Sequence, residues 1–130
     1  MRFASMRVAR PTTDLGRIRE FYEEGVGLEV LWSFVDHDGF DGVIFGFGDE
    51  RAQLELVRTP HGTAPRPTPE DVLVLYCATA SEAESLAARL RSRGVPVVAA
   101  DDPELNPYWP HNGAVTFVDP DGYRLIIAFG

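Results

Sequence analysis

Three histidines are the residues best suited to move a proton or to bind a metal ion at neutral pH, because imidazole titrates in that range. They are His37, His61 and His111. None belongs to a His-x-His or His-Glu-x-x-His pattern, so their spacing does not indicate a metal site. His111 is the favoured ligand-binding histidine and a candidate catalytic base, because it shares a loop with Tyr108 and Trp109.

Other chemistries lack the residues that they need. All twelve basic residues are Arg, so no lysine amine can form a Schiff base. The single cysteine, Cys77, lies in an apolar run and has no partner for an internal disulfide, which is typical of a buried small side chain. The chain has neither a phosphate-binding glycine loop nor paired cysteines. We therefore expect no cofactor.

Two large aromatic residues occupy a segment too irregular to be a core strand. Tyr108 and Trp109 lie between two prolines. Exposed loops seldom carry such apolar surface, so these side chains either cap the core or contact a ligand. Stacking on a planar ligand would suit Trp109. Trp32 and Tyr76, on predicted strands, are further candidates for the wall of a binding site, with core packing as the alternative.

Charge and hydropathy restrict the partners. The formal net charge is −8 and the basic residues form no cluster, so nucleic acid is not an expected partner. No apolar run is long enough to span a membrane, and the first residues do not resemble a signal peptide. These features favour a cytoplasmic protein with a small organic molecule as its partner.

The elements of the first half alternate in type. A short strand is predicted at 3–8, followed by a helix that begins after Asp14 and ends at Gly27. Leu28, Val30, Trp32 and Phe34 then alternate with polar residues, which predicts a strand with these four side chains on one face. A turn at 36–39 and strands at 43–47 and 53–57 complete a β-α-β-β-β module over about residues 1–58.

The second half repeats this order after a linker at 59–71 that is rich in proline. A strand is predicted at 72–77. Ser81 and Glu84 form a capping box that begins a helix, which Gly94 ends. Strands at 95–98, 114–118 and 123–129 follow, so the second module covers residues 72–130.

The two modules have matching positions. The interval between Gly27 and Gly94 equals that between Asp14 and Ser81. We therefore predict an α+β fold in a single domain at 1–130, in which two tandem β-α-β-β-β modules form a curved mixed β-sheet that encloses a pocket.

Three motifs, in their order along the chain, resemble the vicinal oxygen chelate superfamily of glyoxalases, bleomycin-resistance proteins and dioxygenases. The resemblance implies a homodimer. It also places Trp109 near the position of a tryptophan at the binding groove of bleomycin-resistance proteins. The motifs are the helix from Asp14-Leu15 through Phe21-Tyr22 to Gly27-Leu28, the join at Arg93 to Val97, and Phe117-Val118-Asp119-Pro120-Asp121-Gly122-Tyr123.

Metal-dependent members of that superfamily hold a divalent ion with ligands on the first, fourth, fifth and eighth strands. The resemblance places Glu55 in the fourth-strand position. The other positions fall near Arg7, Leu73 and Ile126 or Ile127, which are not metal ligands, so no metal is expected. Glu55 is then a solvent-facing residue, a hydrogen-bonding group or base in the pocket, or a metal ligand. We favour the pocket role, with Arg7 neutralising its charge.

Three functions are consistent with the sequence. The first is metal-independent binding of a small molecule, such as sequestration of an antibiotic or metabolite in resistance. The second is a glyoxalase-like lyase or isomerase, or an extradiol-dioxygenase-like enzyme, with a divalent metal at Glu55; the ligand count argues against it. The third is metal-free acid–base catalysis by Glu55 or His111. The predicted ligand-binding residues are Arg7, Trp32, Glu55, Tyr76, Tyr108, Trp109 and His111.

Overall fold

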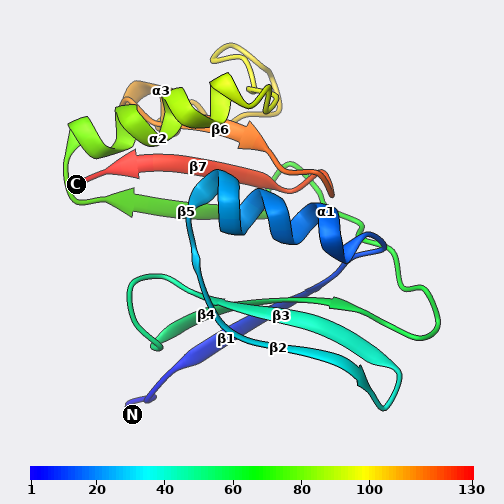
Figure 1. Ribbon diagram of the computed structural model, residues 1–130. Coiled ribbons are helices and arrows are strands. Elements are labelled where there is room, and N and C mark those ends of the chain that lie inside the picture. Colours follow the sequence, from blue (N-terminus) through cyan, green and yellow to red (C-terminus); the bar gives the residue numbers. More distant parts are fainter. The chain divides into compact units, whose positions relative to one another are not determined.

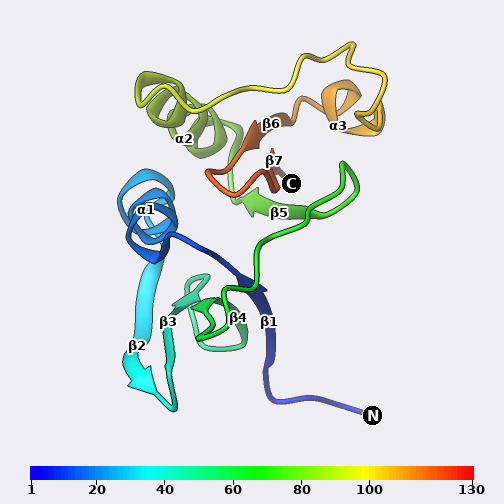
Figure 2. The ribbon, with the colours of Figure 1, turned by 90° about the vertical axis from the view of Figure 1, so that its right-hand side faces the viewer.

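The chain divides into two units, and each is described by itself. The computed structural model describes all residues from Met1 to Gly130. The first unit is Met1–Pro65 and the second is Arg66–Gly130, so the boundary falls within the predicted linker. Each unit has one mixed sheet with a helix packed on it (Figure 1, Figure 2). The α+β fold of two tandem modules is confirmed, but the strands form two sheets where a single one was predicted.

The helix of the first unit begins and ends where the sequence predicts. The α-helix α1 (Leu15–Glu20) continues as a π-helix, η1 (Phe21–Val26). Asp14 caps the start by accepting a hydrogen bond from the backbone N–H of Arg17, 3.1 Å away. Gly27 ends the helix with a φ of 88°, in the left-handed region that glycine tolerates.

Four strands make the sheet of the first unit, in the order β1-β4-β3-β2. The edge strand β1 runs parallel to β4, and the other neighbours are antiparallel. The strand predicted at 3–8 in fact begins at Met6, whose N–H donates to the carbonyl of Arg51 just before β4. The start of the partner strand therefore sets the start of β1. The strands are β1 (Met6–Pro11), β2 (Glu29–His37), β3 (Phe40–Gly46) and β4 (Ala52–Arg58).

The two faces of this sheet have different surroundings. Phe45 is fully buried, and its ring lies 6.1 Å from that of Tyr22 on η1, so it marks the helix-covered face. A β-bulge in β2 pairs Val30 with Phe45 but Trp32 with Ile44, the next residue of β3. The prediction that Val30 and Trp32 share a face is therefore wrong. The bulge inserts one residue and shifts the alternation, so that Trp32 lies on the face opposite the helix.

The second unit has a three-stranded sheet in the order β5-β7-β6, with β5 parallel to β7. The strand predicted at 95–98 is wrong, because that segment forms only an isolated bridge between Val97 and Phe117. Pro96 has no N–H to donate, and the chain leaves the sheet after Val98. The elements are β5 (Val72–Cys77), α2 (Ala80–Ser92), α3 (Tyr108–His111), β6 (Val115–Val118) and β7 (Arg124–Phe129).

The N-cap of helix α2 lies two residues before the predicted one. Thr79, and not Ser81, is the N-cap, and its hydroxyl accepts a hydrogen bond from the N–H of Glu82 at 3.1 Å. Thr79 and Glu82 have the same Ser/Thr-x-x-Glu spacing as the pair that was predicted. The buried stripe of α2 consists of Ala83, Ala87 and Leu90. None of the helices is both long and apolar enough to span a membrane.

The position of this cap gives a direct test. We expect Thr79→Ala to lower the free energy of unfolding by about 1 kcal/mol, because an orphan N–H at the helix start loses its acceptor. Ser81→Ala should change it by less than about 0.5 kcal/mol, as for a surface position without such a role. Urea denaturation of both variants makes the comparison, and a larger loss for Ser81→Ala would contradict the assignment.

Candidate functional site

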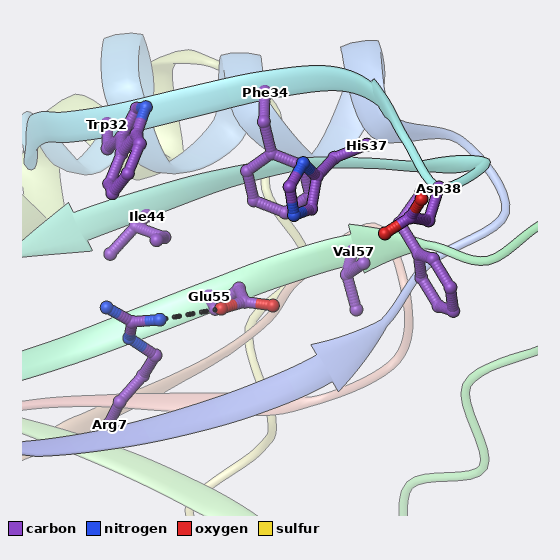
Figure 3. A pocket seen from close by; sticks show the side chains of 9 residues that line it. Arg7, Trp32, Phe34, His37, Asp38, Ile44, Glu55 and Val57 are labelled. Carbon is purple, nitrogen blue, oxygen red and sulfur yellow. Dashed lines mark hydrogen bonds and ion pairs between the residues drawn. The ribbon is translucent and has the colours of Figure 1, made fainter.

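The open face of the first sheet carries a groove of about 430 Å³, which we call the first-unit groove (Figure 3). All four strands of the first unit and the β2–β3 turn contribute to it. Most of its lining is aromatic or aliphatic, and charged groups lie along β1 and β4 and at the turn. The lining residues are Arg7, Trp32, Phe34, His37, Asp38, Phe40, Ile44, Glu55 and Val57.

An ion pair occupies the β1–β4 side of the groove. Arg7 Nη1 lies 3.1 Å from Glu55 Oε1, and Arg7 Nε donates to Gln53 Oε1 at 2.9 Å. The register pairs Arg7 with Gln53 and Ala9 with Glu55, so both charged side chains lie on one face. The side chain of Glu55 is 18% exposed and that of Arg7 is 46% exposed. Glu55 therefore lines the groove beside Arg7, and the ligand-binding role of both residues stays a prediction.

An aromatic wall from β2 faces the ion pair across β3. The Trp32 and Phe34 side chains project over the groove face (Figure 3), and Trp32 is 68% exposed. Phe34 can lie over the sheet only because its partner on β3 is Gly42. A Cβ at Gly42 would come within 2.3 Å of Phe34 Cζ. Phe34 was absent from the predicted site, although its alternation with Trp32 was a usable signal.

The β2–β3 turn closes one end of the groove. Asp36 and Asp38 have positive φ values of 51° and 53°, a conformation that Asp tolerates better than most residues. The Asp41 carboxylate holds the turn by accepting from the N–H of Asp36 at 2.7 Å and by pairing with Arg58. These two contacts, the backbone N–H first, lower the pKa of Asp41. His37 was predicted in this turn and is the last residue of β2. Its ring meets that of Phe34 edge-to-face, with ring centroids 6.2 Å apart.

The four remaining predicted residues belong to the second unit, and their ligand-binding role also stays a prediction. Trp109 packs against a cluster formed by Ala114, Ile126 and Ala128. Its ring meets that of Tyr108 edge-to-face at 5.0 Å. Tyr76 is 60% exposed on β5, and His111 is exposed at the end of α3.

The metal-ligand positions implied by the resemblance can be compared with the sheet registers. Glu55 lies on the face of its sheet away from the helix. In the second sheet, Phe117 marks the helix side, because Arg91 of α2 lies over its ring. Phe117 pairs with Leu125, so the neighbouring residue Ile126 lies on the opposite face and corresponds to Glu55. Neither unit contains a group of three or more His, Cys, Asp or Glu residues that could hold a metal ion.

The comparisons with known proteins concern nearly the whole chain. Residues 6–57 match the YycE-like N-terminal domain, and residues 70–128 match the YycE-like C-terminal domain. YycE of Bacillus subtilis is 41% identical over 124 residues, which cover 95% of this chain and 86% of YycE. The crystal structure of YycE, described as a candidate glyoxalase or fosfomycin-resistance protein of unknown function, matches with a TM-score of 0.84 at 39% identity. That match covers 97% of this chain and 88% of YycE.

Two other solved structures have the same fold. One is the trypanothione-dependent glyoxalase I of Leishmania major, with 25% identity, a TM-score of 0.73, and coverage of 99% of this chain and 87% of that one. The other is TnmS3, an antibiotic-binding protein of Streptomyces, with 24% identity, a TM-score of 0.67, and coverage of 96% and 93%. These structures confirm the vicinal oxygen chelate fold that the sequence motifs predicted.

The lowered pKa of Asp41 predicts a pH-dependent contribution to stability. Its folded-state pKa lies below the ordinary value of 3.8, so its contacts stabilise the protein above that pH and cease to do so as the pH falls through the folded-state pKa. Asp41→Asn should therefore lower the melting temperature at pH 7, and the difference from the wild type should close as the pH falls through the folded-state pKa, below 3.8. Asp101→Asn, at an exposed residue without such contacts, is the control. A difference that persists in acid would contradict this assignment.

The contact between Gly42 and Phe34 gives a second prediction. Gly42→Ala should push the Phe34 ring away from the sheet and lower the free energy of unfolding by about 1 kcal/mol. This value is at the low end for an overpacked site, because the ring is half-buried. The His37 ring signals in the NMR spectrum should shift as their aromatic neighbour moves. Gly16→Ala, in helix α1 where an added Cβ would only contact Asp14 Oδ1 at 3.9 Å, should be neutral or stabilising by up to about 1 kcal/mol. Unchanged His37 signals in Gly42→Ala would show that Phe34 has not moved.

Proposed function

We propose that this protein binds a small organic molecule in the first-unit groove without a metal ion. The chain belongs to the YycE-like family and has the vicinal oxygen chelate fold. The observation that carries the proposal is the Arg7–Glu55 ion pair within an otherwise mostly apolar groove. Sequestration of an antibiotic or related metabolite is the role that such binding would serve.

The ion pair argues for binding without metal on electrostatic grounds. A divalent ion at Glu55 would lie close to the Arg7 guanidinium, which is only 3.1 Å from one carboxylate oxygen. The two cations would repel each other, and the pair already neutralises the carboxylate. The corresponding position of the second module is Ile126, which has no donor atom. The chemistry of the residues present therefore does not fit the divalent-metal set of the superfamily.

The shape and lining of the groove support a small aromatic ligand. Its volume of about 430 Å³ lies within the range of roughly 300–1,000 Å³ that is usual for small-molecule sites. The rings of Trp32 and Phe34 offer stacking surfaces, and Ile44 lies between them and the ion pair. Such a lining gains affinity by burying apolar surface, while the few polar groups orient the ligand.

The fold is consistent with a binding role. TnmS3 is an antibiotic-binding protein with this fold, although at 24% identity it bears on the fold alone. Glyoxalase I of Leishmania major shows that the same fold also serves an enzyme. A metal ion held by Glu55, which can be measured, would distinguish a metal-dependent enzyme from a protein that binds its ligand without metal.

Metal analysis tests the proposal directly. We expect the purified protein to contain less than stoichiometric Zn, Ni, Mn and Fe, and its melting temperature to stay constant when these ions are added. A metal that bound only the folded state at 100 times its Kd would stabilise it by about 2.7 kcal/mol. Glu84→Gln, at an exposed residue of α2, is the control for Glu55→Gln. Stoichiometric metal that is lost in Glu55→Gln but kept in Glu84→Gln would overturn the proposal and favour a metal-dependent enzyme.

A further inference from the structure

The Arg7–Glu55 pair leaves hydrogen-bonding groups available to a ligand. Arg7 uses Nε for Gln53 and Nη1 for Glu55, and its Nη2 donates to no group of the protein. Glu55 uses Oε1 for Arg7, and its Oε2 accepts from no group of the protein. Both side chains are partly exposed within the groove, where they lie side by side (Figure 3). The pair therefore offers a donor and an acceptor on the same side of the groove.

Their orientation is held by the sheet. Gln53 accepts from Arg7 Nε and donates through its own Nε2 to the carbonyl of Glu50 at 2.9 Å. Arg7 is thus restrained on two sides, by Gln53 and by Glu55. A donor and an acceptor that are oriented before the ligand arrives cost less ordering entropy on binding.

The charges that line the groove disfavour ionic ligands. Arg7 is the one cationic lining residue, while Glu55 and Asp38 are anionic, and the whole chain carries a formal charge of −8. An anion would meet Arg7 but also the carboxylate beside it. A cation would meet Glu55 but also the guanidinium. Each kind of ion would be attracted by one of the two groups and repelled by the other at a similar distance. A neutral polar group can instead place its negative end near Arg7 and its positive end near Glu55.

The spacing across the sheet favours a flat ligand. Trp32 pairs with Ile44, and Ile44 pairs with Glu55. Two interstrand steps of about 4.8 Å therefore separate the backbone of Trp32 from that of Glu55. Ile44 forms the floor of this interval, which a flat ring system can occupy with its apolar part against the aromatic wall and its polar edge toward the ion pair.

We propose that the groove selects an uncharged planar molecule of the aryl carboxamide or lactam class. Its carbonyl oxygen accepts from Arg7 Nη2, and its N–H donates to Glu55 Oε2. This inference rests on the proposed function, since it assigns a ligand class to the same groove. It makes Glu55 a specificity-determining residue, because the carboxylate both accepts the N–H and offsets the charge of Arg7.

Three matched probes test the ligand class. They are naphthalene-2-carboxamide, naphthalene-2-carboxylate and naphthalen-2-ylmethylammonium, which share a ring system and differ in charge. Isothermal titration calorimetry at pH 7 should give the carboxamide a Kd at least tenfold lower than those of the other two. The indole N–H signal of Trp32, assigned with Trp32→Phe, should shift on binding.

The variant Glu55→Gln should abolish the selectivity for the carboxamide over the carboxylate. Without the carboxylate, the charge of Arg7 is no longer offset, so the ratio of the carboxylate Kd to the carboxamide Kd should fall at least tenfold. Glu84→Gln makes the same change in net charge on an exposed face of α2 and should leave the ratio unchanged. Thermal unfolding of both variants shows whether they are folded. The comparison of the three probes on the wild type needs no variant at all.

The outcomes separate this inference from the proposed function. If the carboxylate or the ammonium probe binds the wild type more tightly than the carboxamide, with the Trp32 signal shifted, the ligand class is wrong and the groove is still a binding site. An equal loss of selectivity in Glu55→Gln and Glu84→Gln would also overturn the role of Glu55. If none of the probes shifts Trp32 at millimolar concentration, both the ligand class and the groove as an aromatic-binding site are refuted.

Discussion

The parallel pairing of β1 with β4 is the constraint on which the candidate site depends. Parallel neighbours need a long crossover, which here consists of the helix and two antiparallel strands. The pairing brings Arg7 and Glu55 to one face of the sheet although 48 positions separate them in the sequence. A register shifted by one residue would place one of the two charges under the helix, where it would be buried without its partner.

The aromatic wall depends on two local departures from regular strand structure. The bulge in β2 moves Trp32 to the groove face, and Gly42 leaves room for the Phe34 ring to lie over β3. Neither feature is needed for the core, because Phe45, Leu54 and Leu56 pack on the other face and are almost fully buried. The buried core and the first-unit groove thus lie on opposite faces of the same sheet. Side chains on the groove face can change with little effect on the core.

The repeated module shows how one topology can carry two surfaces of different chemistry. Both units pair their first strand in parallel with their last. The face away from the helix carries Arg7 and Glu55 in the first unit. In the second unit, that face carries Ile126 and Ala128 beneath Trp109. A glyoxalase I and an antibiotic-binding protein share this fold, so the side chains on this face, and not the fold, decide the chemistry.

The sequence by itself determined most of the secondary structure and the family. Caps and helix-ending glycines at Asp14, Gly27 and Gly94 are local signals, so they could be recognised without the fold. The motif order was sufficient to predict the vicinal oxygen chelate fold, which the solved structures confirm. The N-cap at Thr79 was mispredicted because two overlapping Ser/Thr-x-x-Glu patterns fit the start of the same helix. The strand at 95–98 was mispredicted because Pro96 has no N–H and the chain leaves the sheet after Val98, which limits the pairing with β6 to an isolated bridge.

Only the tertiary structure decided which side chains share the groove. Strand register places Arg7 beside Glu55, the bulge sets the direction of Trp32, and Gly42 admits Phe34. Each of these depends on contacts between segments that are distant in the chain. Alternation within one strand cannot reveal a bulge, because the inserted residue is visible only against the partner strand. The residue types that could bind a ligand were therefore readable in the sequence, whereas their arrangement was a property of the sheet.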